Sequence, residues 1–183
     1  AIVSAWLKKN GCHLFKELNY YTLQDEITKR QGSANAYTDD QLELIFAAVK
    51  ADGKSELNNL LVLQLYSGVR VGACYPIYYD KIELVAGFND VYTYEVSSKG
   101  AQYPAFISKA AYDYLQRVRR PGQSLVVQYD TGYASPFSEV YRRQLINSII
   151  KHNLFRVCQG TSLFHSFRKA YSQKLLLAAS LPG

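Results

Sequence analysis

Apolar residues recur at helical spacing directly after a polar helix-start motif at Thr38. In Thr38-Asp-Asp-Gln41, the Thr38 hydroxyl is placed to accept a hydrogen bond from the Gln41 amide, as in a capping box. The apolar positions that follow at helical spacing are Leu42, Ile45, Phe46 and Val49. Asp52-Gly53 then interrupts the pattern, so the sequence predicts one helix between these two signals.

A second helix is predicted between Ser55 and Gly68. Serine is a favoured N-cap residue, and glycine commonly ends a helix in the left-handed conformation. Four leucines share one face of this segment: Leu57, Leu60, Leu61 and Leu65. We expect this face to be buried in the core.

After residue 80 the period of the apolar positions changes to two, which is typical of strands. Strand-like patterns surround Ile82 and Leu84 and cover residues 91–96 and 102–107, and residues 87–90 read as a turn. The last two segments are connected through Ser97-Ser-Lys-Gly100, which predicts an antiparallel hairpin with Lys99 near its tip.

The remaining chain again has helical spacing. Ser108 is predicted to cap a helix that stops at Pro121-Gly122, and Ser138 to open another. A last helix is expected over about residues 165–179, and residues 125–128 form a candidate short strand. Helices, a small sheet and further helices predict an α+β fold, mostly α, with a small antiparallel three-stranded sheet on one side.

Two regions are expected along the chain. Residues 31–35 are rich in Gly, Ser and Asn and read as a linker. Residues 1–36 are then the linker and helical tail of an N-terminal DNA-binding region, and residues 37–183 form the main domain. The chain has no Met and begins with Ala1, so we expect it to be a piece of a longer protein.

Composition narrows the class of protein. Of the 183 residues, 48% are hydrophobic and 20% are charged, as in globular rather than disordered proteins. No apolar run reaches membrane-spanning length, so no membrane partner is expected. The three cysteines are an odd number without metal-type spacing, which favours a reducing, intracellular location and predicts no zinc site.

The positive charge is concentrated near the end of the chain. Residues 37–100 carry five basic and nine acidic side chains, whereas residues 101–183 carry eleven basic and three acidic ones. A basic face of this kind binds a polyanion such as DNA, because each neutralised phosphate releases counterions. A solubilising surface is the alternative interpretation of the same excess.

Four basic residues from three distant segments of the chain are candidates for one site. His165 and Arg168 are three residues apart and share a helix face. Together with Arg70, the Arg168 guanidinium could hold one phosphate, and Lys99 on its turn could donate a proton to a leaving oxygen. Each residue also has an ordinary interpretation, such as an ion pair between Arg70 and Asp80.

In order and surroundings these motifs resemble the catalytic domain of the tyrosine recombinases, the phage integrase family, over about residues 37–183. The matching segments are Thr38-Asp-Asp-Gln-Leu42, Leu63-Gln-Leu-Tyr-Ser-Gly-Val-Arg70, Asp80-Lys-Ile82, Ser98-Lys-Gly100 with Tyr103-Pro104, and Leu163-Phe-His-Ser-Phe-Arg-Lys-Ala-Tyr171. The last segment, which resembles the family's H-x-x-R box, is the most specific.

The resemblance implies a site-specific DNA recombinase or integrase that cleaves and rejoins strands through a 3′-phosphotyrosine. It implies that Arg70 and Arg168 hold the phosphate, that Lys99 protonates the leaving 5′-oxygen, and that His165 assists proton transfer. No metal, ATP or other cofactor is required. The partner is double-stranded DNA in a homotetrameric synapse, with a monomer expected for the present chain. Further DNA contacts are expected from Arg142, Arg143, Lys169 and Lys174.

Two departures from the family pattern bear on activity. Ala73 stands where the family has an acidic residue three positions after its first arginine. The family's nucleophilic tyrosine follows the H-x-x-R box by about three dozen residues, so we expect it beyond Gly183 and assign none here. Tyr171 lies on the H-x-x-R helix itself, at a packing position of the family.

Three alternatives remain open at this stage. The first is a DNA-binding module of the same fold without catalysis, which Ala73 and the missing tyrosine motivate. The second is a metal-dependent nuclease, for which the candidate carboxylates are Asp80, Glu83, Asp90 and Glu95. The third is an enzyme with a cysteine nucleophile, Cys74 or Cys158.

Overall fold

The structure is a computed structural model that describes residues 35–130, 136–158 and 161–180. The chain divides into two compact units, Ala1–Ser33 and Ala34–Gly183, and every described residue belongs to the second. The proposed N-terminal region of residues 1–36 therefore lies almost wholly outside the described residues and stays a prediction.

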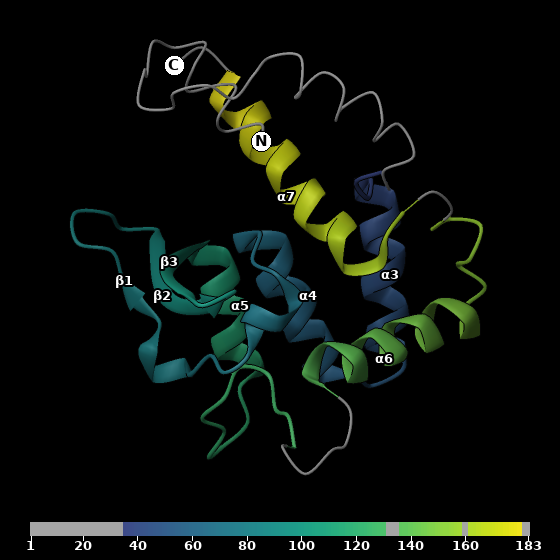
Figure 1. Cartoon of the computed structure of the whole chain (residues 1–183), viewed down its shortest axis with the longest axis horizontal. Coiled ribbons are helices and arrows are strands. Elements are labelled where there is room, and N and C mark those ends of the chain that lie inside the picture. Colours follow the sequence, from purple (N-terminus) through teal and green to yellow (C-terminus); the bar gives the residue numbers. More distant parts are fainter. Residues whose placement is uncertain (1–34, 131–135, 159–160, 181–183) are drawn as a thin grey trace. The chain divides into compact units, whose positions relative to one another are not determined.

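The described residues form five α-helices and one three-stranded sheet, which confirms the predicted α+β class (Figure 1). The helices are α3 (Asp39–Ala51), α4 (Ser55–Ser67), α5 (Lys109–Val118), α6 (Phe137–Lys151) and α7 (Leu163–Ser180). The strands are β1 (Glu83–Leu84), β2 (Val91–Ser98) and β3 (Ala101–Ser108), and two 3-10 turns, η2 (Val71–Cys74) and η3 (Tyr79–Lys81), connect α4 to the sheet. Within these residues no helix is long and apolar enough to cross a bilayer.

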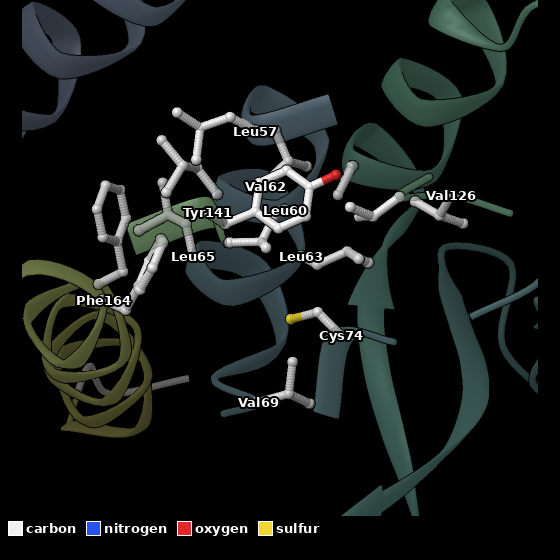
Figure 2. Packing of buried hydrophobic residues seen from close by; sticks show 14 of the residues in the cluster. Leu57, Leu60, Val62, Leu63, Leu65, Val69, Cys74, Val126, Tyr141 and Phe164 are labelled. Atoms are coloured by element: carbon white, nitrogen blue, oxygen red, sulfur yellow. The ribbon is translucent and has the colours of Figure 1, made fainter. Parts of the chain in front are cut away.

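Helix α4 is the centre of the core. It contacts α3, α6 and α7 as well as β3 and α5, and all of the residues from Leu60 to Leu65 are buried. The predicted leucine face is confirmed, since Leu57, Leu60 and Leu61 have no exposed surface. Figure 2 shows Leu57, Leu60 and Leu63 between Phe164 of α7 and Val126, with Val69 and Cys74 below them. The end of α4 is thus fixed by packing on every side.

Two of the four predicted helix caps are confirmed. Thr38 and Gln41 form both hydrogen bonds of the capping box of α3, and the Ser108 hydroxyl accepts from the Ala111 amide at 3.4 Å. The caps predicted at Ser55 and Ser138 are wrong, because each residue already lies inside its helix and neither helix has a side-chain cap.

The sheet is antiparallel with the order β1-β2-β3. Its predicted hairpin is confirmed, although β2 and β3 are longer than expected and leave only Lys99 and Gly100 in the turn. Leu84 is half-exposed, since β1 has only two residues at the sheet edge. The candidate strand at residues 125–128 is wrong: Leu125 forms a single bridge with Tyr78.

Candidate active site

The two candidate arginines lie where α4 and α7 pack against each other, one after the end of α4 and the other on α7. Arg70 is exposed and follows α4 by three residues, in extended backbone immediately before η2. Arg168 is half-buried in the second turn of α7. Because α4 and α7 pack against each other, residues almost a hundred positions apart in the sequence lie at one place.

Gly68 fixes the orientation of Arg168. This glycine ends α4 in the left-handed conformation, with φ +65°, and its carbonyl oxygen accepts a hydrogen bond from Arg168 Nε at 2.6 Å. Tyr171, one turn further along α7, lies against the Gly68 Cα, so that a Cβ at position 68 would be 2.7 Å from Tyr171 Cε1. Only glycine satisfies both the backbone angle and this close approach.

The two guanidinium groups act on each other electrostatically. Partial burial lowers the pKa of Arg168, and the positive charge of Arg70 lowers that pKa further. In residues 35–130, 136–158 and 161–180, no carboxylate lies within ion-pair distance of either arginine. The acceptors to which their side chains donate are neutral groups, so no carboxylate in the described part of the chain compensates the positive charge of the pair.

The turn that carries Lys99 lies next to Arg70. Arg70 Nη1 donates to the Ser98 hydroxyl at 3.3 Å, and Lys99 is the following residue. Lys99 is exposed and has a φ of +53°, as the first position of a tight two-residue hairpin turn requires. The structure therefore brings the backbone of Lys99 to the arginine pair.

His165 lies in the first turn of α7 on the same face as Arg168. Its side chain is exposed, and its backbone amide donates to the Ser162 carbonyl oxygen at 2.8 Å. The spacing of three residues places it about 4.5 Å before Arg168 along the helix axis. Arg70, Lys99, His165 and Arg168 thus all come from segments that meet where α4 ends.

The four residues expected to bind DNA have different surroundings. Arg142 and Arg143 are exposed on α6, and Arg143 pairs with Glu139 at 3.4 Å. Lys174 of α7 pairs with Asp39 of α3 at 2.6 Å, and Lys169 is half-buried. The role of these four residues in binding DNA stays a prediction.

Tyr103 is a neighbour of the arginine pair that the sequence interpretation did not single out. It lies on β3 opposite Val96, on the face whose other members, such as Ala105, are buried, and it is 36% exposed. Burial and Arg70 lower the pKa of Arg168, and the nearby Tyr103 acts in the opposite direction. The alternation of the strand could have indicated it, since residues 103, 105 and 107 share one face.

Ala73, the position at which the family has an acidic residue, is buried beneath Arg70. Its backbone amide donates to the Arg70 carbonyl oxygen at 2.8 Å, and its side chain is 2% exposed. An alanine supplies neither charge nor hydrogen bond to the guanidinium groups. Residue 73 therefore provides no negative partner for the two arginines.

A second charged cluster, absent from the sequence interpretation, surrounds Asp52. Its carboxylate is 3% exposed and accepts hydrogen bonds from Lys151 at 2.6 Å and from the Ser148 hydroxyl at 2.7 Å, while His152 Nε2 lies at 3.0 Å. These hydrogen bonds hold the pKa of Asp52 well below its usual range. The sequence signal was the spacing of residues 148, 151 and 152, which share one face of α6.

The nuclease and cysteine alternatives find little support. Within the described residues no three His, Cys, Asp or Glu side chains are grouped closely enough to hold a metal ion together, the carboxylates at positions 80, 83, 90 and 95 included. Burial raises the pKa of the Cys74 thiol and of Cys158. A raised pKa keeps a thiol protonated, which is the opposite of what a nucleophilic cysteine needs.

Comparison with known proteins identifies no relative. No protein-family model, no curated protein and no solved structure matches this chain.

Proposed function

We propose that the chain is the catalytic region of a DNA strand-transferase of the tyrosine-recombinase type, a site-specific recombinase or integrase. The observation that carries the proposal is the pair formed by Arg70 and Arg168, whose two positive charges have no carboxylate partner in the described part of the chain. An uncompensated guanidinium pair is suited to a phosphodiester, because each fork can donate to two phosphate oxygens.

In the proposed reaction a tyrosine phenol oxygen attacks the scissile phosphorus and the bond from phosphorus to the 5′-oxygen breaks. Arg70 and Arg168 stabilise the additional negative charge on the phosphorane oxygens. Lys99 gives its proton to the departing 5′-oxygen, and His165 accepts the proton of the attacking phenol. The bond energy is conserved in the 3′-phosphotyrosine, so a second 5′-hydroxyl can reverse the step without ATP.

The nucleophile is not among the described residues in this proposal. No residue of this chain is assigned as the nucleophile, and the active assembly in this proposal is a homotetramer on two DNA duplexes. Arg142, Arg143, Lys169 and Lys174 would add contacts to the DNA backbone outside the scissile phosphate.

Covalent trapping tests the catalytic proposal. A protein that contains this chain and supplies the attacking tyrosine is incubated with a nicked suicide DNA duplex, and the expected product is a protein–DNA adduct that survives denaturation. Arg70→Ala and Arg168→Ala should each reduce adduct formation by about 10²–10³-fold, the usual effect of removing one charge-stabilising donor. DNA binding without any adduct would contradict the proposal.

A DNA-binding module without catalysis is the second candidate, and Ala73 favours it. In a site that lacks the acidic neighbour, the arginines could still bind a phosphate while being poorly placed for reaction. The same trapping experiment separates the two candidates. A gain of adduct in Ala73→Asp or Ala73→Glu over the unsubstituted chain would show that only this position limits the chemistry.

A further inference from the structure

The hydroxyl of Tyr94 is buried between the sheet and the end of α4. Tyr94 lies on β2 with 2% of its surface exposed, and its hydroxyl donates to the Ser67 hydroxyl at 2.8 Å. Burial raises the pKa of this phenol, so it remains a proton donor at any working pH. A buried donor of this kind is costly unless its acceptor is held in place.

Ser67 is such an acceptor. It is the last residue of α4, and its own hydroxyl proton is directed to the Leu63 carbonyl oxygen at 2.6 Å. A serine hydroxyl has one donor, which Leu63 uses, and lone pairs, one of which Tyr94 uses. The side chain is therefore held from both sides at the point where the helix ends.

The next residue after Ser67 provides the acceptor for Arg168. Gly68 donates its amide to the Gln64 carbonyl oxygen at 3.0 Å and accepts Arg168 Nε at 2.6 Å. Ser67 and Gly68 are consecutive in the chain, so a hydrogen bond that restrains Ser67 also limits the backbone angles available to Gly68, which holds a φ of +65° at the helix end. Two hydrogen bonds, from Tyr94 to Ser67 and from Arg168 to Gly68, thus connect the sheet and the guanidinium to the same end of α4.

We propose that Tyr94 is a positioning residue for Arg168, acting through Ser67 and the Gly68 carbonyl. The hydroxyl does not touch the substrate. It holds the end of α4 so that the remaining N–H groups of Arg168 face the position of the phosphate. This inference rests on the proposed function, in which Arg168 binds a DNA phosphate.

The first test measures the hydrogen bond itself, without DNA. In the ¹⁵N-labelled 183-residue chain, Tyr94→Phe and Ser67→Ala should each shift the Nε–H resonance of Arg168 and accelerate its exchange with water by about three- to tenfold. The matched control is Tyr92→Phe, which removes a hydroxyl from the same strand, where the ring stacks on Tyr112. An unchanged Arg168 resonance in both test variants would overturn the proposal.

The second test is a double-mutant cycle read by affinity for a labelled DNA duplex. Tyr94→Phe should weaken binding by about three- to tenfold in the original chain, and have no effect when Arg168 is already Ala. Equal effects in both backgrounds would show a merely structural role and overturn the proposal. If Arg168→Ala alone leaves DNA binding unchanged, the proposed function fails, while the resonance measurement still decides the role of Tyr94.

Discussion

The Arg70–Arg168 pair and the Asp52 cluster are both groups of charged side chains, but only the charge of Asp52 is balanced by opposite charges among the described residues. Asp52 is surrounded by Lys151, His152 and Ser148, so its single negative charge has more partners than it needs. Among the described residues, the side chains of the two arginines donate to a carbonyl oxygen, from Gly68, and to a hydroxyl, from Ser98. The Asp52 cluster is balanced in charge without a ligand. The arginine pair has hydrogen-bond acceptors but keeps its positive charge available for an anion.

This difference separates a cluster that stabilises the fold from a candidate binding site. Asp52 ends α3, and its partners belong to α6, so the cluster holds two helices together. The arginine pair is held by backbone geometry and not by counter-charges. Its weak point should accordingly be a glycine, while the weak point of the Asp52 cluster should be the carboxylate.

Gly68→Ala should give the largest loss of stability. The alanine would occupy the left-handed region, which costs about 1–2 kcal/mol, and its Cβ would collide with Tyr171, which adds about 1–3 kcal/mol. Urea unfolding measures the sum. Gly53→Ala is the matched control, because Gly53 has a φ of +67° with nothing within 4 Å, and it should show only the first cost. Equal losses at both positions would refute the close approach of α7 to Gly68.

Asp52→Asn should be the next most damaging change. It removes the negative charge to which Lys151 and His152 are directed, and leaves two basic groups near each other. Thermal unfolding at neutral pH should show a clear decrease, in contrast to Asp90→Asn in an exposed turn. If the two variants have the same unfolding temperature, the Asp52 cluster does not link α3 to α6.

At acid pH the original chain and Asp52→Asn should have the same free energy of unfolding. Hydrogen bonds lower the pKa of Asp52 in the folded state, so its contribution to stability is complete above the unfolded pKa and is lost as pH falls below about 4. The gap between the two urea midpoints should therefore be constant near neutrality and narrow in acid. A gap that is independent of pH would mean that the charge of Asp52 is not what stabilises the fold.

Arg70→Met should have the smallest effect on folding. The side chain is exposed and has no carboxylate partner, so the free energy of unfolding should change by no more than about 0.5 kcal/mol. DNA binding should nevertheless weaken, and the slope of log affinity against log salt should decrease by about one. Arg120→Met is the control, because Arg120 pairs with Glu56, and it should leave the salt slope unchanged.

Local signals predicted most of the fold. The capping box at Thr38 and the leucine face of α4 depend on neighbours within a few residues, and both are present. The start of α4 was misplaced at Ser55 because the ammonium of Lys54, the true N-cap, binds Gln144 and Ser148 of α6. Contacts between distant segments decided that boundary, and no local pattern reports them.

The sequence indicated four candidate residues but not the groups that hold them in place. Arg70, Lys99, His165 and Arg168 could be singled out because they resemble ordered motifs. Their acceptors could not, since the Ser98 hydroxyl reaches Arg70 only through the register of the hairpin. Likewise, the Gly68 carbonyl meets Arg168 only after α7 has packed on α4.

The hairpin turn between β2 and β3 has one more consequence. Because only Lys99 and Gly100 lie outside the β-ladder, the turn is too short for the backbone of Lys99 to change position. The register of the paired strands therefore determines where Lys99 lies. Any insertion in this turn lengthens the connection between the two strands and displaces Lys99 relative to Ser98 and Arg70, even though every side chain of the candidate site is retained.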